Sequence, residues 1–251
     1  MDPSAGLGVA TGMGALMFVV VPLLMAGVIA LGVFAFVRAY KEGKRRKATI
    51  EATVAAYGLG HVAEDPARTS LFTSAPFGTG DSRRARDVVW GAFDGRPFET
   101  FAYSYETHST DSEGRRTTTT HHYQVTWVPL PAPLPTLRLT ADNGLLRMAA
   151  KLGARDLKVE SHEFNQRWKV WFQDERTAHA ILTPRMIERF LAPDTARRGY
   201  VFEGHMLFTY EQGPSDLADL HQVVTGLYSI LDLVPPFLFE DRSAQSPGAD
   251  A

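Results

Sequence analysis

Residues 13–37 read MGALMFVVVPLLMAGVIALGVFAFV, and no side chain among them is charged or strongly polar. As an α-helix these 25 residues rise about 37 Å, more than the roughly 30 Å of a bilayer's hydrocarbon core. A helix in a soluble core is rarely apolar on every face over such a length. The stretch therefore predicts one transmembrane helix at Met13–Val37, preceded by a short extracytoplasmic N-terminus, residues 1–12.

A cluster of basic residues follows the apolar run. It consists of Arg38, Lys41, Lys44, Arg45, Arg46 and Lys47. The preceding flank has no lysine or arginine, and the run enters Arg38 without a small-residue cleavage site. We therefore predict an uncleaved signal-anchor of the cell membrane, single-pass, with its N-terminus outside and its C-terminal domain in the cytoplasm.

The same basic residues define the first expected partner, the lipid bilayer. They would lie against anionic headgroups, each charge contributing on the order of 1 kcal/mol near the surface. The simpler interpretation is that they set the topology and do nothing more. Residues 38–58 are expected to form a basic juxtamembrane helix, whose end at Gly58 follows Ile50, Val54 and Tyr57 at helical spacing.

Charge and composition exclude several classes of function. The formal net charge is −2, and because residues 38–47 contribute +5, the rest of the chain carries −7. An acidic body argues against nucleic acid as a partner, because phosphate binding needs clustered lysine and arginine. The chain has no cysteine, which excludes disulfides, thiolate metal sites and cysteine nucleophiles.

Residues 59–242 predict one cytoplasmic α+β domain with mainly antiparallel strands and inserted helices. After an irregular stretch at 59–87 the sequence predicts three strands, and in the second and third of them aromatic residues alternate at period two. We expect these strands at 88–93, 97–106 and 123–130, with a long polar hairpin tip between the second and third. The alternating prolines at 129–135 indicate an extended connector leading into a strand at 136–140. The other interpretation of these prolines is a polyproline ligand for an aromatic groove.

The C-terminal half alternates short helices and strands. Asp174 and Thr183 are expected N-caps of two consecutive helices, and Glu203-Gly204 is expected to turn a tight pair of strands. A closing amphipathic helix should follow Ser215 and end before Pro235-Pro236. The remaining expectations are a helix at 143–152, strands at 157–160 and 167–172, and a disordered tail at 243–251.

No motif assigns a catalytic, cofactor-binding or metal-binding residue. Gly58–Ala63 matches G-x-G-x-x-A, but a helix precedes it where the dinucleotide site requires a strand. His162–Gln166 begins like H-E-x-x-H but has glutamine in place of the second histidine, and we expect strand there. His108, His121 and His122 form a histidine cluster for which metal binding stays open. Adjacent strand residues point to opposite faces, so at most two of the three would converge.

A longer pattern resembles a known family. Residues 160–171 read ESHEFNQRWKVW and residues 178–186 read AHAILTPRM. Gly91–Tyr105 matches the pattern G-x-x-x-G-x-x-F-x-x-F-x-Y-x-Y. These stretches resemble an uncharacterised family of bacterial, largely actinobacterial, single-pass membrane proteins with a domain of unknown function and an E-S-x-x-F-N … L-T-P-x-M pattern. The resemblance implies an anchored domain and assigns no catalytic residue.

These observations favour a membrane-anchored cytoplasmic binding or scaffolding domain over an enzyme. Its ligand and its protein partner are not specified by any motif, and no cofactor is expected. The alternative hypothesis is an enzyme with an unrecognised active site around Glu160, His162 and Glu163.

Overall fold

The computed structural model describes residues 7–141, 157–196, 198–213 and 215–243, with side chains placed in 25–141, 157–196, 198–213 and 215–240. The chain divides into two compact units, Met1–Thr49 and Ile50–Ala251. The predicted helix at 143–152 lies outside the described residues, as does the predicted tail from residue 244 onward.

All described residues of the first unit belong to one long helix, α1 (Leu7–Tyr57). This helix confirms the helical conformation predicted for residues 13–37 and for the basic segment that follows them. It ends before Gly58, which adopts a φ of +62°. Within the described residues, no helix combines the length and the hydropathy needed to cross a membrane.

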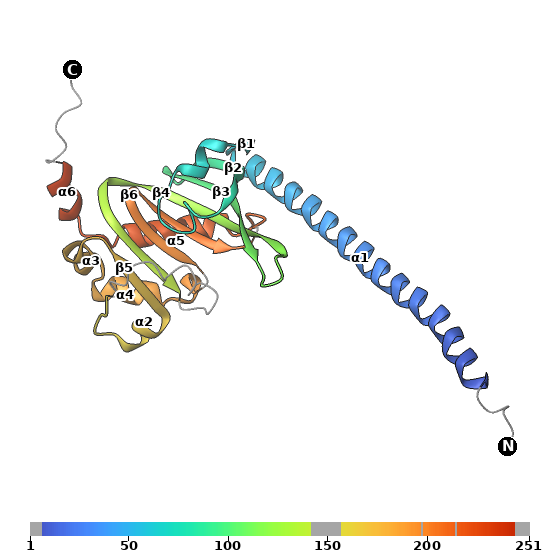
Figure 1. The fold of residues 1–251 in the computed structure, drawn as a ribbon. Coiled ribbons are helices and arrows are strands. Elements are labelled where there is room, and N and C mark those ends of the chain that lie inside the picture. The colour runs from blue at the N-terminus through green and yellow to red at the C-terminus, as the bar shows by residue number, and fades with distance from the viewer. Residues whose placement is uncertain (1–6, 142–156, 197, 214, 244–251) are drawn as a thin grey trace. The chain divides into compact units, whose positions relative to one another are not determined.

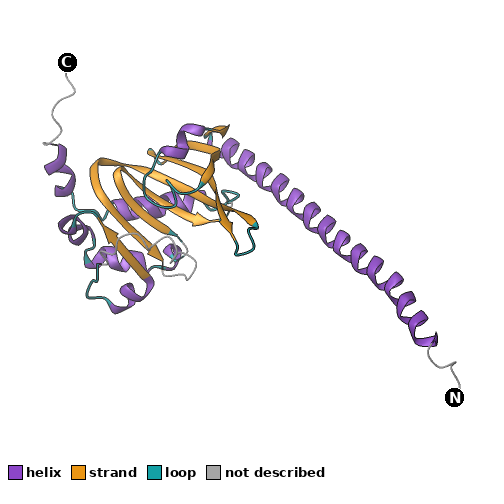
Figure 2. Cartoon of the chain, in the orientation of Figure 1, coloured by secondary structure: helices purple, strands orange, loops and turns teal. Residues whose placement is uncertain are grey.

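The second unit is built on a six-stranded sheet in which every neighbouring pair is antiparallel (Figures 1 and 2). Its strands are β1 (Gly60–Glu64), β2 (Asp81–Phe93), β3 (Arg96–Thr110), β4 (Arg116–Ala141), β5 (Trp168–Phe172) and β6 (Gly199–Gln212). The order is β1-β2-β3-β4-β5, with β6 on β4. The predicted α+β class with mainly antiparallel pairing is confirmed.

The proline-rich run forms the outside of a corner in the paired strands β4 and β6. Between the pairs Pro129↔Met206 and Leu134↔Gly204, residues 130–133 of β4 oppose only His205. At this bend β4 is the outer strand, so it needs more residues than β6 to pass the corner. Prolines fit at these positions because a residue without a strand partner does not have to donate an N–H hydrogen bond. The predicted connector is thus part of β4, and the apolar residues between its prolines are buried.

β6 bends at the same corner. Thr209 Oγ donates to the Gly199 carbonyl at 2.9 Å, although ten residues of straight strand would separate them by roughly 33 Å. Gly204, with a φ of +56°, allows the reversal. The predicted turn at Glu203-Gly204 is therefore present, but the predicted pairing is wrong, because both halves of β6 pair with β4.

The two faces of the sheet are covered differently. On one face, Phe72 and Phe77 from the segment before β2 pack on a buried aromatic cluster that includes Phe101, Tyr103 and Phe208. The other face packs against the helices α2 (His162–Arg167), α3 (Glu175–Ile181), α4 (Pro184–Leu191), α5 (Leu220–Leu231) and α6 (Phe237–Ser243). Ile50, near the end of α1, belongs to this second core and is 2% exposed.

Two loop predictions are corrected by longer strands. The polar hairpin tip is reduced to residues 111–115, because β3 continues to Thr110 and β4 begins at Arg116. Threonines and serines pair across these arms, for example Thr107 with Thr119, and β-branched side chains favour strand even when exposed. The irregular stretch 59–87 contains β1, the 3₁₀ helix η1 (Pro66–Ser70) and the first half of β2.

The segment around the E-S-x-x-F-N pattern also differs from expectation. No strand forms at 157–160, because the Asn165 side chain takes the place of a partner strand. Its Oδ1 accepts from Val159 N at 3.1 Å and its Nδ2 donates to Val159 O at 2.6 Å. Residues 162–167 form α2 in place of the expected strand, since the Ser161 hydroxyl accepts from Phe164 N as an N-cap.

The later helix signals are confirmed, with one shift. Asp174 accepts from Thr177 N at 2.9 Å and Thr183 accepts from Met186 N at 3.3 Å, as N-caps of α3 and α4. The amphipathic helix α5 begins later than expected, at Leu220. Ser215 instead accepts from Leu217 N in the preceding turn. The apolar stripe of α5 is buried, as predicted.

Candidate functional site: a tryptophan groove

A row of three side chains crosses the sheet on its aromatic-cluster face. Trp90 of β2 is directly opposite Glu99 of β3, and Glu99 is directly opposite Trp127 of β4. Direct cross-strand neighbours share a face. The two tryptophans therefore stand two strand spacings apart, about 9–10 Å, with a carboxylate between them.

Glu99 is fixed by bonds that use both of its oxygens. It is 7% exposed, and its carboxylate accepts from Arg68 Nε at 2.7 Å, Arg68 Nη2 at 3.0 Å and Trp127 Nε1 at 3.2 Å. The hydrogen bond from Arg68 to Glu99 raises the pKa of Arg68, and burial opposes that rise only in part. A bidentate pair of this kind holds both side chains in one geometry.

η1 positions Arg68. Asp65 is its N-cap, accepting from Ala67 N at 3.0 Å, and its other oxygen lies 3.7 Å from Arg68 Nη1. The arginine thus lies between two carboxylates, one on η1 and one on the sheet.

These residues border an open groove of about 400 Å³. Most of its wall is apolar, with Val62, Val88, Phe98, Pro97 and Pro129 beside the two tryptophans. Trp90 is 44% exposed and Val62 is 39% exposed, so apolar side chains on two neighbouring strands are open to solvent beside this hollow.

Gly60 determines where the Trp90 ring lies. Gly60 is directly opposite Trp90 in the pairing of β1 with β2. A Cβ atom at Gly60 would lie 2.2 Å from Trp90 Cε2, so the indole rests on the glycine backbone. Any larger residue at position 60 would displace the ring from this side of the groove.

The groove can offer donors and acceptors at its edges and apolar ring faces at its centre. Across the described part of the chain, Trp90 Nε1 has no hydrogen-bond partner, which leaves one indole donor available. Glu99 Oε2 accepts one bond, from Arg68 Nη2, and a carboxylate oxygen can accept a second. This combination suits binding, and no nucleophile adjoins a base among the groove residues.

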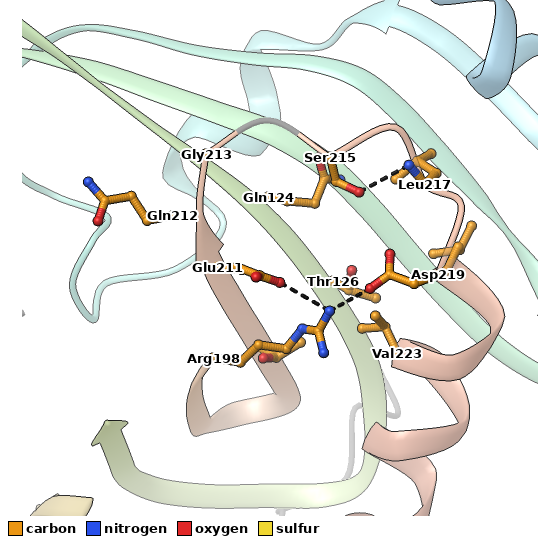
Figure 3. Close-up of a pocket in the computed structure, with 12 residues that line it drawn as sticks. Gln124, Thr126, Arg198, Glu211, Gln212, Gly213, Ser215, Leu217, Asp219 and Val223 are labelled. Carbon is orange, nitrogen blue, oxygen red and sulfur yellow. Dashed lines mark hydrogen bonds and ion pairs between the residues drawn. The ribbon is translucent and has the colours of Figure 1, made fainter. Parts of the chain in front are cut away.

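A second hollow of about 220 Å³ is polar and lies where β6 meets the turn before α5 (Figure 3). Arg198 lines this hollow and pairs with two acids. Its Nη2 lies 3.0 Å from Glu211 Oε2 and 2.6 Å from Asp219 Oδ2. Figure 3 shows this guanidinium between the two carboxylates, which come from the end of β6 and the start of α5. Arg198 therefore ties the folded-back β6 to the closing helix, which is a structural role.

The residues predicted from the sequence lie elsewhere. The six basic residues at 38–47 are on α1, where Arg38 Nε donates to Glu42 at 3.0 Å. Gly58 ends α1 and Gly60 begins β1, so a helix does precede this glycine pair. Glu160, His162 and Glu163 are all exposed near the start of α2.

The histidines do not converge on one point. His121 Nε2, on β4, lies 2.9 Å from Thr107 Oγ on β3. His108 Nδ1, on β3, lies 3.0 Å from Thr118 Oγ, which is three residues before His121 on β4. In the described ranges, no group of three or more histidine and acidic side chains could hold a metal ion. His162 Nε2 lies 2.9 Å from Gln166 Nε2, one helical turn away.

Sequence reasoning missed the groove because its residues are far apart in the chain. Arg68 and Glu99 are 31 positions apart, and no motif connects them. One signal was available: Glu99 occupies the same alternation as Phe101, Tyr103 and Tyr105. A carboxylate on the aromatic face of a strand needs a partner when it is buried.

Comparison with known proteins agrees with the resemblance in part. A family model described as a protein of unknown function (DUF3137) matches residues 136–219, a range that includes the E-S-x-x-F-N and L-T-P-x-M patterns. No curated protein matches the sequence.

A solved structure is similar to this chain. It is the crystal structure of the mycobacterial trehalose monomycolate transport factor A, TtfA, with a TM-score of 0.50 and 16% identity. The alignment covers 77% of this chain and 96% of that chain. At this identity the likeness shows a shared fold.

Proposed function

We propose that this chain is a single-pass membrane protein whose cytoplasmic domain binds a ligand in the tryptophan groove. The observation that carries the proposal is the exposed Trp90, held by Gly60 at one side of an apolar hollow and faced by Trp127 across a buried Glu99. A concave, mostly apolar hollow with a few fixed polar groups is typical of a small-ligand site.

Two features of α1 support the membrane anchor. Its described apolar side chains are more than half exposed at Met25, Val28, Ile29, Leu31, Val33, Phe34 and Phe36. Water does not favour such a surface on a helix, whereas lipid does. The basic residues at 38–47 support cytoplasmic placement of the domain that follows and contact with anionic headgroups.

The shared fold suggests the kind of task. TtfA is named as a trehalose monomycolate transport factor, and we propose that this chain also assists the transport of a membrane lipid. Its role would be to bind a lipid or a protein partner at the membrane surface. Binding is favoured over catalysis because the charged groups of the groove are engaged with one another.

A site-specific photocrosslinker tests the groove in the intact chain. A benzophenone side chain placed at Val62, which is exposed and borders the groove, should give a discrete adduct in native membranes. Adding Trp90→Ala should remove that adduct. The matched control places the same crosslinker at Glu113, in the exposed hairpin turn. Identical adducts from both positions, or none from Val62, would refute the groove as a binding site.

Reporter fusions test the orientation. A reporter active only in the cytoplasm, fused after Ala251, should work, and one that requires export should not. Replacing the six basic residues of 38–47 by glutamine should weaken this bias. The opposite pattern of reporter activity would show that the domain faces outward.

A further inference from the structure

The tryptophan groove also indicates the chemical class of its ligand. We infer that it takes a neutral sugar ring, a pyranose seated between Trp90 and Trp127 with its hydroxyls on the polar edge. This inference rests on the proposed function, since it names the ligand of the same groove.

The spacing of the row suits one saturated ring. The strands that carry the two indoles are separated by β3 alone, which places their backbones about 9–10 Å apart. A ring between two aromatic side chains needs a contact of about 3.5–4.0 Å on each side. Glu99 of β3 lies between the two tryptophans at the level of the sheet, so a bound ring would rest above its carboxylate with one indole on each side.

The charges of the groove disfavour an ionic ligand. Arg68 lies at the groove between Asp65 and Glu99. A cation entering the groove would meet the guanidinium, and a phosphate or carboxylate would meet the two acids. Because Arg68 already pairs with both acids, a cation would compete with the guanidinium for the carboxylates, and a phosphate or carboxylate would compete with the acids for the guanidinium. A neutral ligand leaves the pair intact.

The remaining hydrogen-bonding capacity favours hydroxyl groups. Trp90 Nε1 is an available donor, while Glu99 Oε2 and Asp65 Oδ2 can each accept a further bond. A hydroxyl both donates and accepts, so adjacent sugar hydroxyls can meet both kinds of group. A proline-rich peptide presents mainly carbonyl acceptors and would leave the carboxylate capacity unused. An acyl chain would satisfy neither.

The apolar wall suits the other side of the same ligand. The C–H faces of a pyranose are apolar, and they can cover the indoles while the hydroxyls reach the charged edge. The hollow of about 400 Å³ lies within the range of small-ligand sites. Only a ligand with apolar faces and a hydroxylated rim matches both walls.

Calorimetric titration of the full chain tests the inference. The protein is held in a polyoxyethylene detergent, because glycoside detergents would occupy the proposed site. Methyl α-D-glucopyranoside and maltose are the probes. Sorbitol supplies hydroxyls without a ring face, while glucuronate and protonated glucosamine add a charge to the ring. The two neutral sugars should bind at least tenfold more tightly than the other three.

Variants assign the binding to the groove. Trp90→Ala should weaken sugar binding about tenfold or more, and Gly60→Ala should weaken it as well by displacing the ring. Trp171→Ala, on β5, is the matched control and should bind as the native chain does. Equal binding of sorbitol or glucuronate, unchanged binding by Trp90→Ala, or no sugar binding at all overturns the inference. If the Val62 crosslink persists without sugar binding, the groove remains a binding site for a different ligand.

Discussion

Replacing Leu227 by alanine should destabilise the second unit strongly, because α5 closes the core on one face of the sheet. Leu227 is 1% exposed, in the same core as Leu220, Val224 and Ile230. The substitution removes three carbons, worth about 0.8 kcal/mol each as buried hydrocarbon. The cavity that remains adds to this, so the total loss should reach about 3–4 kcal/mol, within the range measured for buried leucines.

The assay is thermal unfolding of the full chain in detergent, followed by near-ultraviolet circular dichroism. For a domain of about 200 residues, each kcal/mol shifts the midpoint by about 2–4 °C, so Leu227→Ala should lower it by about 6–16 °C. Gln222→Ala, on the exposed face of α5, should leave the midpoint within about 1 °C. An unchanged midpoint for Leu227→Ala would show that α5 is not part of the folded core, and the closure argument would be abandoned.

Truncation of α1 and neutralisation of Asp194 test two further parts of the fold. Deleting residues 1–47 should give a folded fragment that leaves the membrane fraction. Deleting residues 1–57 also removes buried Ile50, which should lower the free energy of unfolding by about 2–5 kcal/mol. Equal melting temperatures for the two fragments would contradict this prediction. The hydrogen bond from Arg189 lowers the pKa of Asp194. Asp194 therefore stabilises the fold above its unfolded pKa of about 3.9, and this contribution is lost as pH falls through the lower folded value. Asp194→Asn should lower the midpoint at pH 7 and flatten its acid dependence, and an unchanged acid profile would argue against the pair.

Local signals in the sequence were sufficient for many elements. Side chains that cap a helix act within three residues, so the sequence alone predicts the N-caps Asp174 and Thr183. Alternation along a strand is equally local, so the aromatic faces of β3 and β4 were predicted correctly. The groove's tryptophans were visible as members of these strands, but not as a pair.

Other local signals were ambiguous between two structures. Glu203-Gly204 fits a hairpin turn as well as a corner in a paired strand, because both need a positive φ at glycine. The pattern around residue 162 fits a strand as well as a helix, and the N-cap Ser161 decides for α2. The threonine-rich arms are polar on both faces, which is typical of a loop, yet they pair as strands.

The sequence by itself determined the long N-terminal helix, the alternation of the strands and the capped helices, because each depends on neighbours a few residues apart. Only the tertiary structure decided that β4 and β6 bend together, that Arg68 reaches Glu99, and that Trp90 and Trp127 border one groove. Those contacts depend on the register between strands distant in the chain. Register is set by the packing of whole faces, which no single stretch of sequence specifies.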